Sequence, residues 1–227
     1  MVLPTSEVGS VTTIHQQFYN NTTIPPITLE HVDLASLTSK SVADLVATLS
    51  GTRLGVAASY GKRCVLKTLA FSTESRVLFI TMDGNSKSAK RQKRVLSDDL
   101  LYNSSLEKHG FFMERLAAAL HLDLGIYIRS AFDITSDGDY RGSMAAYKSI
   151  LARARTEDCL NGSVVKSVFR ECPFVLSRKA KFALRAWACY AGVQGVPEKP
   201  GAIDTSAKDP QACSVFQLCI FFPDRSD

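Results

Sequence analysis

The acidic residues of this sequence are the first place to look for chemistry, because carboxylates hold divalent metal ions. Asp133, Asp137 and Asp139 fall in one short run, Phe-Asp-Ile-Thr-Ser-Asp-Gly-Asp, which could form a loop site for a metal. Aspartate and glycine are also the usual residues of turns, and no second acidic cluster falls on a predicted strand or helix, which favours an ordinary turn. The other aspartates considered are scattered: Asp83, Asp98, Asp99 and Asp123.

Two groups of basic residues are candidates for contact with nucleic acid. The first follows Gly84-Asn85-Ser86 and could bind phosphates or act as a nuclear-import signal, although a solvated loop explains it equally well. No aromatic residue is interleaved with these charges, so base stacking is not indicated there. The second group begins the last predicted helix, where solvated side chains are also common. The candidates are Lys87, Lys90, Arg91, Lys93 and Arg94, followed by Arg178, Lys179 and Lys181.

The cysteines and histidines indicate neither a metal site nor a nucleophile. The six cysteines stand singly among apolar neighbours, with no Cys-x-x-Cys pair, so buried free thiols are expected. His109 and His121 have no partner at a catalytic or metal-ligand spacing. We therefore expect no metal and no cofactor.

The composition predicts one globular domain. The chain has 227 residues, of which 45% are hydrophobic and 22% charged, which is enough to bury a sizeable core. The net charge of +5 permits contact with nucleic acid without requiring it. No apolar stretch reaches the roughly 20 residues of a membrane helix, and the first residues lack the pattern of a secretory signal. We expect an intracellular protein, of the nucleus or cytoplasm, with no membrane partner.

These candidate residues must be positioned by strands and helices, and the predicted order of these elements indicates an α/β fold with a mixed sheet. A helix over 37–49, with Thr38 or Ser39 as N-cap, precedes three strands over 54–59, 64–71 and 76–82, whose short connections predict an antiparallel meander. Periodicity and propensity predict the later elements. These are a short helix from Asp98, helices over 111–120, 144–154 and 178–193, and a strand over 130–134.

The sequence predicts that the chain is divided into three parts. Residues 1–28, rich in Thr, Ser, Asn and Pro, predict a flexible N-terminal tail. Residues 29–194 predict the folded domain. Residues 195–227 predict a Pro/Gly-rich linker and an apolar run, Cys213 to Phe222, that forms a strand or docks on another surface.

The region from Leu37 to Val193 resembles the DEDD class of 3′ to 5′ exonucleases, the class of RNase D and the Werner exonuclease domain. The family's first strand carries apolar-Asp-x-Glu, and the matching strand here, Leu54 to Ser59, has Ala57 and Ser59 at the acidic positions. The family's Lys-x-Gly segment, which leads to an aspartate, matches Lys108 to Leu116, with Leu116 in the place of the aspartate.

Two later segments extend this resemblance. Phe132-Asp133-Ile134-Thr135 is similar to the Phe-Asp-Thr that ends a strand in the family. Leu176-Ser177 then precedes a helix that in the family bears a tyrosine and, four residues on, the last aspartate. Ala183 and Trp187 stand at those positions here, and the Trp187 ring is expected to fill the emptied cleft.

The resemblance implies an RNase H-like fold, an antiparallel three-strand meander plus parallel strands flanked by helices, without the carboxylates that hold two metal ions. It implies an inactive exonuclease-like domain that serves as a protein-interaction scaffold in an RNA-processing or RNA-silencing assembly. Two alternatives stay open: sequence-tolerant binding of single-stranded RNA, and an active metal-dependent 3′ to 5′ exonuclease with displaced carboxylates. The expected partner is a protein of a ribonucleoprotein or silencing complex, with homodimerisation left open.

Overall fold

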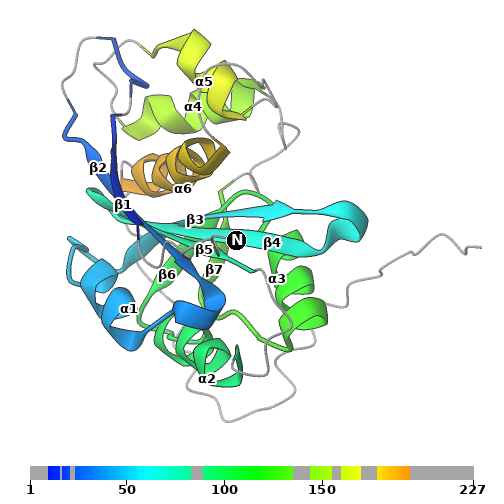
Figure 1. The fold of residues 1–227 in the computed structure, drawn as a ribbon. Helices are drawn as coiled ribbons and strands as arrows, with labels where there is room; N and C mark the ends of the chain where they lie inside the picture. The colour runs from blue at the N-terminus through cyan, green and yellow to red at the C-terminus, as the bar shows by residue number, and fades with distance from the viewer. Residues whose placement is uncertain are drawn as a thin grey trace, which may run out of the picture. The chain divides into compact units, whose positions relative to one another are not determined.

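A mixed sheet of seven strands in the order β1-β2-β5-β4-β3-β6-β7 forms the centre of the computed structural model (Figure 1). The structure describes residues 10–15, 17–20, 24–82, 89–134, 144–154, 160–169 and 178–194. The strands are β1 (Ser10–Ile14), β2 (Ile27–Asp33), β3 (Arg53–Tyr60), β4 (Leu66–Ser72), β5 (Arg76–Thr81), β6 (Glu107–Gly110) and β7 (Ala131–Asp133).

The strand directions confirm the predicted RNase H-like fold class. β3, β4 and β5 form the antiparallel meander, and β6 and β7 extend it from β3 in parallel. Short turns after β3 and β4 bring consecutive strands back beside one another. A second hairpin, β1 antiparallel to β2, is attached because β2 pairs in parallel with β5.

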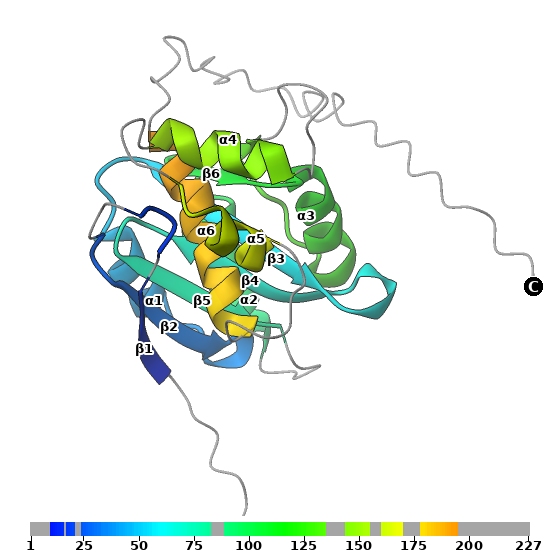
Figure 2. The ribbon, with the colours of Figure 1, turned by 90° about the horizontal axis from the view of Figure 1, so that it is seen from above.

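Helices cover both faces of this sheet (Figures 1 and 2). α1 (Ser39–Val46), α2 (Ala89–Arg94) and α3 (Met113–Ala119) lie on one side, and α4 (Met144–Ala154), α5 (Gly162–Phe169) and α6 (Arg178–Gln194) lie on the other. Short turns of other helical types complete the fold: η1 (Leu34–Ser36), η2 (Lys62–Cys64), η3 (Val95–Leu101) and η4 (Leu120–Leu124).

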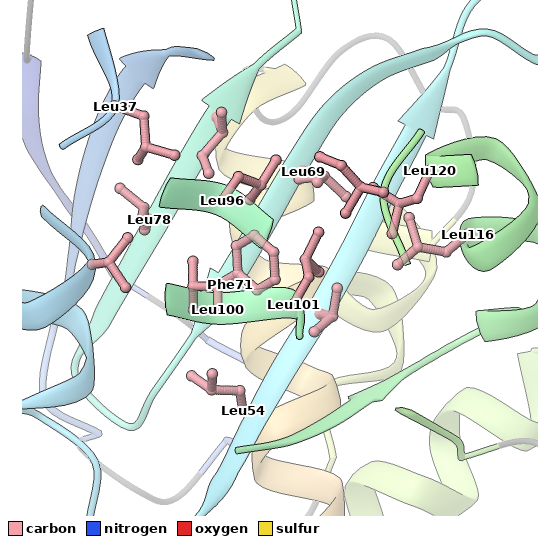
Figure 3. Close-up of a cluster of buried hydrophobic side chains, with 14 of the residues drawn as sticks. Leu37, Leu54, Leu69, Phe71, Leu78, Leu96, Leu100, Leu101, Leu116 and Leu120 are labelled. Atoms are coloured by element: carbon pink, nitrogen blue, oxygen red, sulfur yellow. The ribbon is translucent and has the colours of Figure 1, made fainter. Parts of the chain in front are cut away.

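The sheet separates two apolar clusters, since alternate residues of a strand point to opposite faces. We call the cluster beneath α1, η3 and α3 the α1-side core; it is rich in leucine (Figure 3). We call the cluster beneath α4, α5 and α6 the α6-side core. Leu54 and Val56 of β3 belong to the α1-side core, whereas Ala57 contacts the α6-side core.

The α1 helix begins where the sequence predicts it. The Thr38 hydroxyl accepts a hydrogen bond from the Ser41 amide at 3.1 Å, so Thr38 is the N-cap. Val42 and Leu45 are buried, as the helical spacing of apolar residues requires. The helix ends at Val46, a few residues before the predicted end.

The N-terminal region differs from its prediction. Residues 10–14 form β1 although they lie in the predicted flexible tail, and Phe18 and Tyr19 are buried in the α6-side core. The sheet therefore begins before the predicted boundary at residue 29. Apolar side chains placed irregularly among polar residues supply this packing, which neither a period of two nor one of 3.6 would reveal. Residues 1–9 and the predicted linker and apolar run at 195–227 lie outside the described residues.

Two cysteines can be compared with the prediction of buried thiols. Cys189 in α6 is buried, in agreement, whereas Cys64 in the β3–β4 connection is exposed. Cys64 and Val65 are both exposed in the turn between β3 and β4, and the chain re-enters the core only at Leu66. Among the described helices, none is long and apolar enough to cross a membrane.

Candidate functional site

β3 carries the two positions that match the family's acidic pair, and both face α6. Ala57 contacts the α6-side core, and Ser59, two residues on, points to the same face. Ser59 is buried, and its hydroxyl forms a hydrogen bond with the Thr68 hydroxyl of β4. One methyl group and one hydrogen-bonded hydroxyl therefore occupy the two β3 positions that the sequence resemblance predicts as the acidic pair.

α6 lies directly on this face of the sheet, across β3 (Figure 2). A Cβ added at Gly55 would lie 2.0 Å from the Ala186 carbonyl oxygen and 2.5 Å from the Tyr190 amide nitrogen. The helix can approach this closely because Gly55 has no side chain and α6 presents small residues such as Ala183 and Ala186. The backbone of α6 therefore lies against the start of β3 without space between them.

Ala183 and Trp187 pack in the α6-side core. The Trp187 ring stacks on Phe18, with ring centroids 5.7 Å apart and an interplanar angle of 7°. Its Nε1 donates a hydrogen bond of 3.0 Å to the Glu74 carbonyl oxygen in the β4–β5 turn. These contacts join α6 to the N-terminal segment and to the β4–β5 turn. The sequence pattern did not indicate them for Trp187, which was expected to fill the emptied cleft.

Leu116, the fourth matched position, does not lie with the others. It is buried in the α1-side core, on the opposite face of the sheet from Ala57 and Ala183 (Figure 3). α3 begins at Met113 after Phe112, whose left-handed backbone (φ 57°) turns the chain between β6 and the helix. Counting residues from Lys108 therefore gives a position on the wrong face, and Leu116 cannot stand for a ligand that acts beside positions 57 and 59.

Three aromatic rings gather where β6 ends, on the α6 side. We call Phe111, Tyr147 and Phe169 the aromatic cluster; they come from the residue after β6, from α4 and from α5. Tyr147 stacks on Phe169 with centroids 4.1 Å apart, and Phe111 meets both rings edge-on at 4.7 and 5.5 Å. Burial raises the pKa of Tyr147, against the smaller opposing effect of Arg185. No sequence pattern indicates this cluster, because its members lie on three separate elements.

The Cys189 thiol lies next to this aromatic cluster. Burial is the main cause of its raised pKa, and hydrogen bonds with the backbone of Phe111 and Val56 lower this pKa by a smaller amount. A thiol with a raised pKa is largely protonated at neutral pH and is a poor nucleophile. Cys189 therefore acts as a small apolar group. It packs where α6 meets β3 and the residue that follows β6.

Asp133 is an acidic residue that interacts electrostatically with Cys189. Its Oδ2 accepts a hydrogen bond of 3.1 Å from the Met113 amide, so the carboxylate caps the first turn of α3. Asp137 and Asp139, the other members of the predicted loop site, lie outside the described residues. No group of three or more His, Cys, Asp or Glu side chains placed to hold a metal occurs in the described part of the chain.

The first basic group is helical rather than a loop. Ala89–Arg94 forms α2, which continues into η3 and whose apolar continuation, including Leu96, packs in the α1-side core. Lys90, Arg91 and Arg94 are exposed, and Lys93 is half-buried. Ala, Lys, Arg and Gln are all good helix formers, so the composition of the segment favours this helix, and Leu96 after it packs in the core. Lys87 lies outside the described residues.

The residues of the second basic group, at the start of α6, differ in their exposure to solvent. Arg178 and Lys179 are exposed, and the Lys179 Nζ forms a hydrogen bond of 3.1 Å with His31 Nδ1 on β2. Lys181 is only 8% exposed, so it is not available as a surface contact for nucleic acid. α2 and α6 lie on opposite faces of the sheet (Figure 1), and the two basic groups therefore do not form one continuous helical surface.

The class defined by this geometry is an α/β domain with the strand order of the RNase H-like exonucleases. Solved structures similar to this chain include exonuclease domains of the DEDD class. The catalytic core of RRP6 from Trypanosoma brucei shares 16% identity, with a TM-score of 0.44, over 80% of this chain and 49% of that one. This chain thus spans about half of the RRP6 core.

Two further structures are similar. The exonuclease domain of Nibbler from Aedes aegypti shares 11% identity, with a TM-score of 0.47, over 69% of this chain and 81% of that domain. RNase D from Trypanosoma brucei shares 11% identity, with a TM-score of 0.47, over 75% of this chain and 65% of that one. No protein-family model and no curated protein matches the sequence.

Proposed function

We propose that this chain is an exonuclease-like domain without hydrolytic activity that acts as a protein-interaction scaffold in an RNA-processing or RNA-silencing assembly. The observation that carries the proposal is the α6-facing side of β3. Ala57 and Ser59 stand there in place of an acidic pair, and the Ser59 hydroxyl already has Thr68 as its partner. Two divalent ions need several carboxylates around them, which a methyl group and a hydroxyl cannot replace.

The surroundings of these positions support the same proposal. The aromatic cluster and the Cys189 thiol are apolar groups at the junction of α6 with β3 and β6, and apolar surroundings disfavour bound cations. The Asp133 carboxylate is engaged with the Met113 amide. A nuclease acting through Asp133 would have to bind metal while one carboxylate oxygen caps α3, and it would need further acidic residues.

Incubation of the purified full chain with labelled RNA and DNA in Mn²⁺ tests the loss of hydrolysis. We expect no shortening of either substrate. Metal-dependent, chelator-sensitive shortening that disappears in Asp133→Ala but persists in Asp98→Ala would overturn the proposal and favour displaced carboxylates. Asp98 is a suitable control because it is an exposed aspartate in η3, away from the α6 side.

Affinity purification of the full chain, with and without ribonuclease, tests the scaffold role. A protein of an RNA-processing or silencing complex that stays bound after ribonuclease treatment supports it. Recovery of RNA alone contradicts a scaffold and favours the RNA-binding alternative.

Sequence-tolerant RNA binding is the second candidate, and the exposure of Lys90, Arg91 and Arg94 on α2 favours it. Binding through phosphate contacts predicts an affinity that falls steeply with salt and does not depend on base sequence. Reversing the charges of Lys90, Arg91, Lys93 and Arg94 to glutamate should then weaken binding to every single-stranded RNA. The matched control reverses four exposed basic residues on other elements, Lys40, Lys62, Arg63 and Lys67. No binding at low ionic strength rules this candidate out.

A further inference from the structure

The two ends of the sheet differ in how much pairing surface they offer. β7, at one end, is three residues long, whereas β1, at the other, is five residues long. A strand at the end of a sheet presents backbone N–H and C=O groups that can pair with another strand. Among the described strands, β1 pairs with β2 alone, so the longer of these two edges belongs to β1.

β1 lacks the features that usually protect such an edge. Its sequence is Ser10-Val11-Thr12-Thr13-Ile14, with no charge, no proline and no glycine. Its register with β2 runs without a bulge, and the Val11 side chain is 64% exposed. Protected edges carry lysine, proline or a bulge, and β-branched residues favour further strand pairing. β1 is therefore a regular, uncharged strand suited to accept another.

We propose that the β1 edge binds β1 of a second copy of this chain, antiparallel, about a two-fold axis through Thr12. This pairing places Val11 opposite the partner's Thr13 and Ser10 opposite the partner's Ile14. The two strands are identical and uncharged, so pairing brings no like charges together. The inference goes beyond the proposed function and does not depend on whether the domain hydrolyses nucleic acid.

The packing of β1 also fits a second copy. Ile14 points into the α6-side core, and Thr12 shares its face. A two-fold axis perpendicular to the sheet keeps the helices of both copies on matching faces, so the partner's Ser10 would further cover Ile14. A contact built mainly on five-residue strands is smaller than a standard interface of roughly 1,600 Å², so we expect a weak dimer that forms at protein concentrations on the order of tens of micromolar.

Sedimentation velocity of the full chain over increasing concentration tests the pairing. The wild-type chain should pass from monomer to dimer. Thr12→Lys places two ammonium groups together at the axis and should abolish the dimer, whereas Thr52→Lys, the same change at an exposed site outside β1, should leave it intact. Circular dichroism and thermal melting establish that both variants are folded.

Two variants with opposite charges at position 12 provide the decisive test of the two-fold pairing. Thr12→Lys and Thr12→Glu should each be monomeric alone and should form a mixed dimer when combined, because the two-fold axis brings position 12 against itself. A wild-type chain that stays monomeric across the concentration range overturns the proposal. So does a dimer that persists in Thr12→Lys, since another surface would then hold it.

Discussion

The two faces of the sheet are packed in different ways, although the same strands build both. On the α1 side, leucines such as Leu54, Leu69 and Leu116 interdigitate with the leucines of η3 (Figure 3). On the α6 side, Gly55, Ala57 and the alanines of α6 allow close backbone contact. The positions that match the family's chemistry on β3 and α6 belong to this second face. The α1-side face is therefore filled by large leucine side chains, whereas small residues on the other face let the backbone of α6 lie against β3.

A carboxylate introduced at Leu116 should produce the largest effect. Leu116→Asp would place an unpaired charge among the leucines of the α1-side core, and we expect a loss of about 5 kcal/mol or failure to fold. Leu116→Met keeps the volume and should cost less than about 1.5 kcal/mol. Urea denaturation measures both. A stable Leu116→Asp variant would mean that this position faces a polar site after all.

The closeness of α6 to β3 predicts the next effect. Gly55→Ala forces the new methyl group against the Ala186 carbonyl oxygen, so α6 must shift, and we expect a loss of about 3 kcal/mol. Gly51→Ala is the matched control, because nothing lies within 4 Å of the new Cβ there. A difference of less than about 0.5 kcal/mol between the two variants in the same denaturation assay would contradict tight packing on the α6 side.

Lys108 of β6 links the segments that precede β6 and β7, and it makes stability depend on pH. Its side chain is fully buried, its Nζ donates to the carbonyl oxygens of Asn103 and Arg129, and burial lowers its pKa from 10.5 to about 8. Between these values the unfolded chain keeps the proton that the folded chain has lost, so the stability should rise with pH, by about 3 kcal/mol.

Lys108→Met provides the reference for this pH dependence. The variant should show a smaller rise in unfolding free energy between pH 8 and 10.5 than the wild type. Chemical denaturation at a series of pH values measures the difference. Parallel curves for the two proteins would show that Lys108 does not titrate in this range in the folded state.

The smallest expected effect is that of the conservative change Trp187→Phe, with Trp187→Ala as its larger contrast. Trp187→Phe keeps a ring against Phe18 and removes the hydrogen bond to the Glu74 carbonyl oxygen, which we expect to cost about 1 kcal/mol. Trp187→Ala should cost about 3–5 kcal/mol, because it also empties part of the core. If both substitutions leave the melting temperature unchanged, Trp187 does not hold α6 to the β4–β5 turn.

Short connections and clear periodicity made much of the fold predictable from sequence. The β3–β4–β5 meander, the Thr38 cap and the bounds of α4 and α6 follow from local patterns that the tertiary structure reinforces. β6 was missed because its sequence, Glu-Lys-His-Gly, shows no apolar alternation and buries a lysine instead. α5, a short helix of eight residues, was also missed, in a part of the chain without a predicted element.

The candidate site was less predictable than the fold. Ala57, Ser59, Ala183 and Trp187 could be assigned to their elements, but Leu116 lies on the opposite face of the sheet, in a helix that follows the left-handed residue Phe112. A bulky residue at positive φ has no signature in sequence, because side chains there are disfavoured and tolerated only through surrounding packing. The aromatic cluster required contacts between β6, α4 and α5 that only the folded chain brings together.

The position of α6 in the chain order has a consequence for biosynthesis. β3 and β4 are complete by residue 72, but the helix that covers their second face spans 178–194. During translation, one side of the nascent sheet therefore stays bare while more than a hundred further residues are added. At about 5–20 residues per second this interval lasts several seconds, during which the growing chain would be a substrate for chaperones.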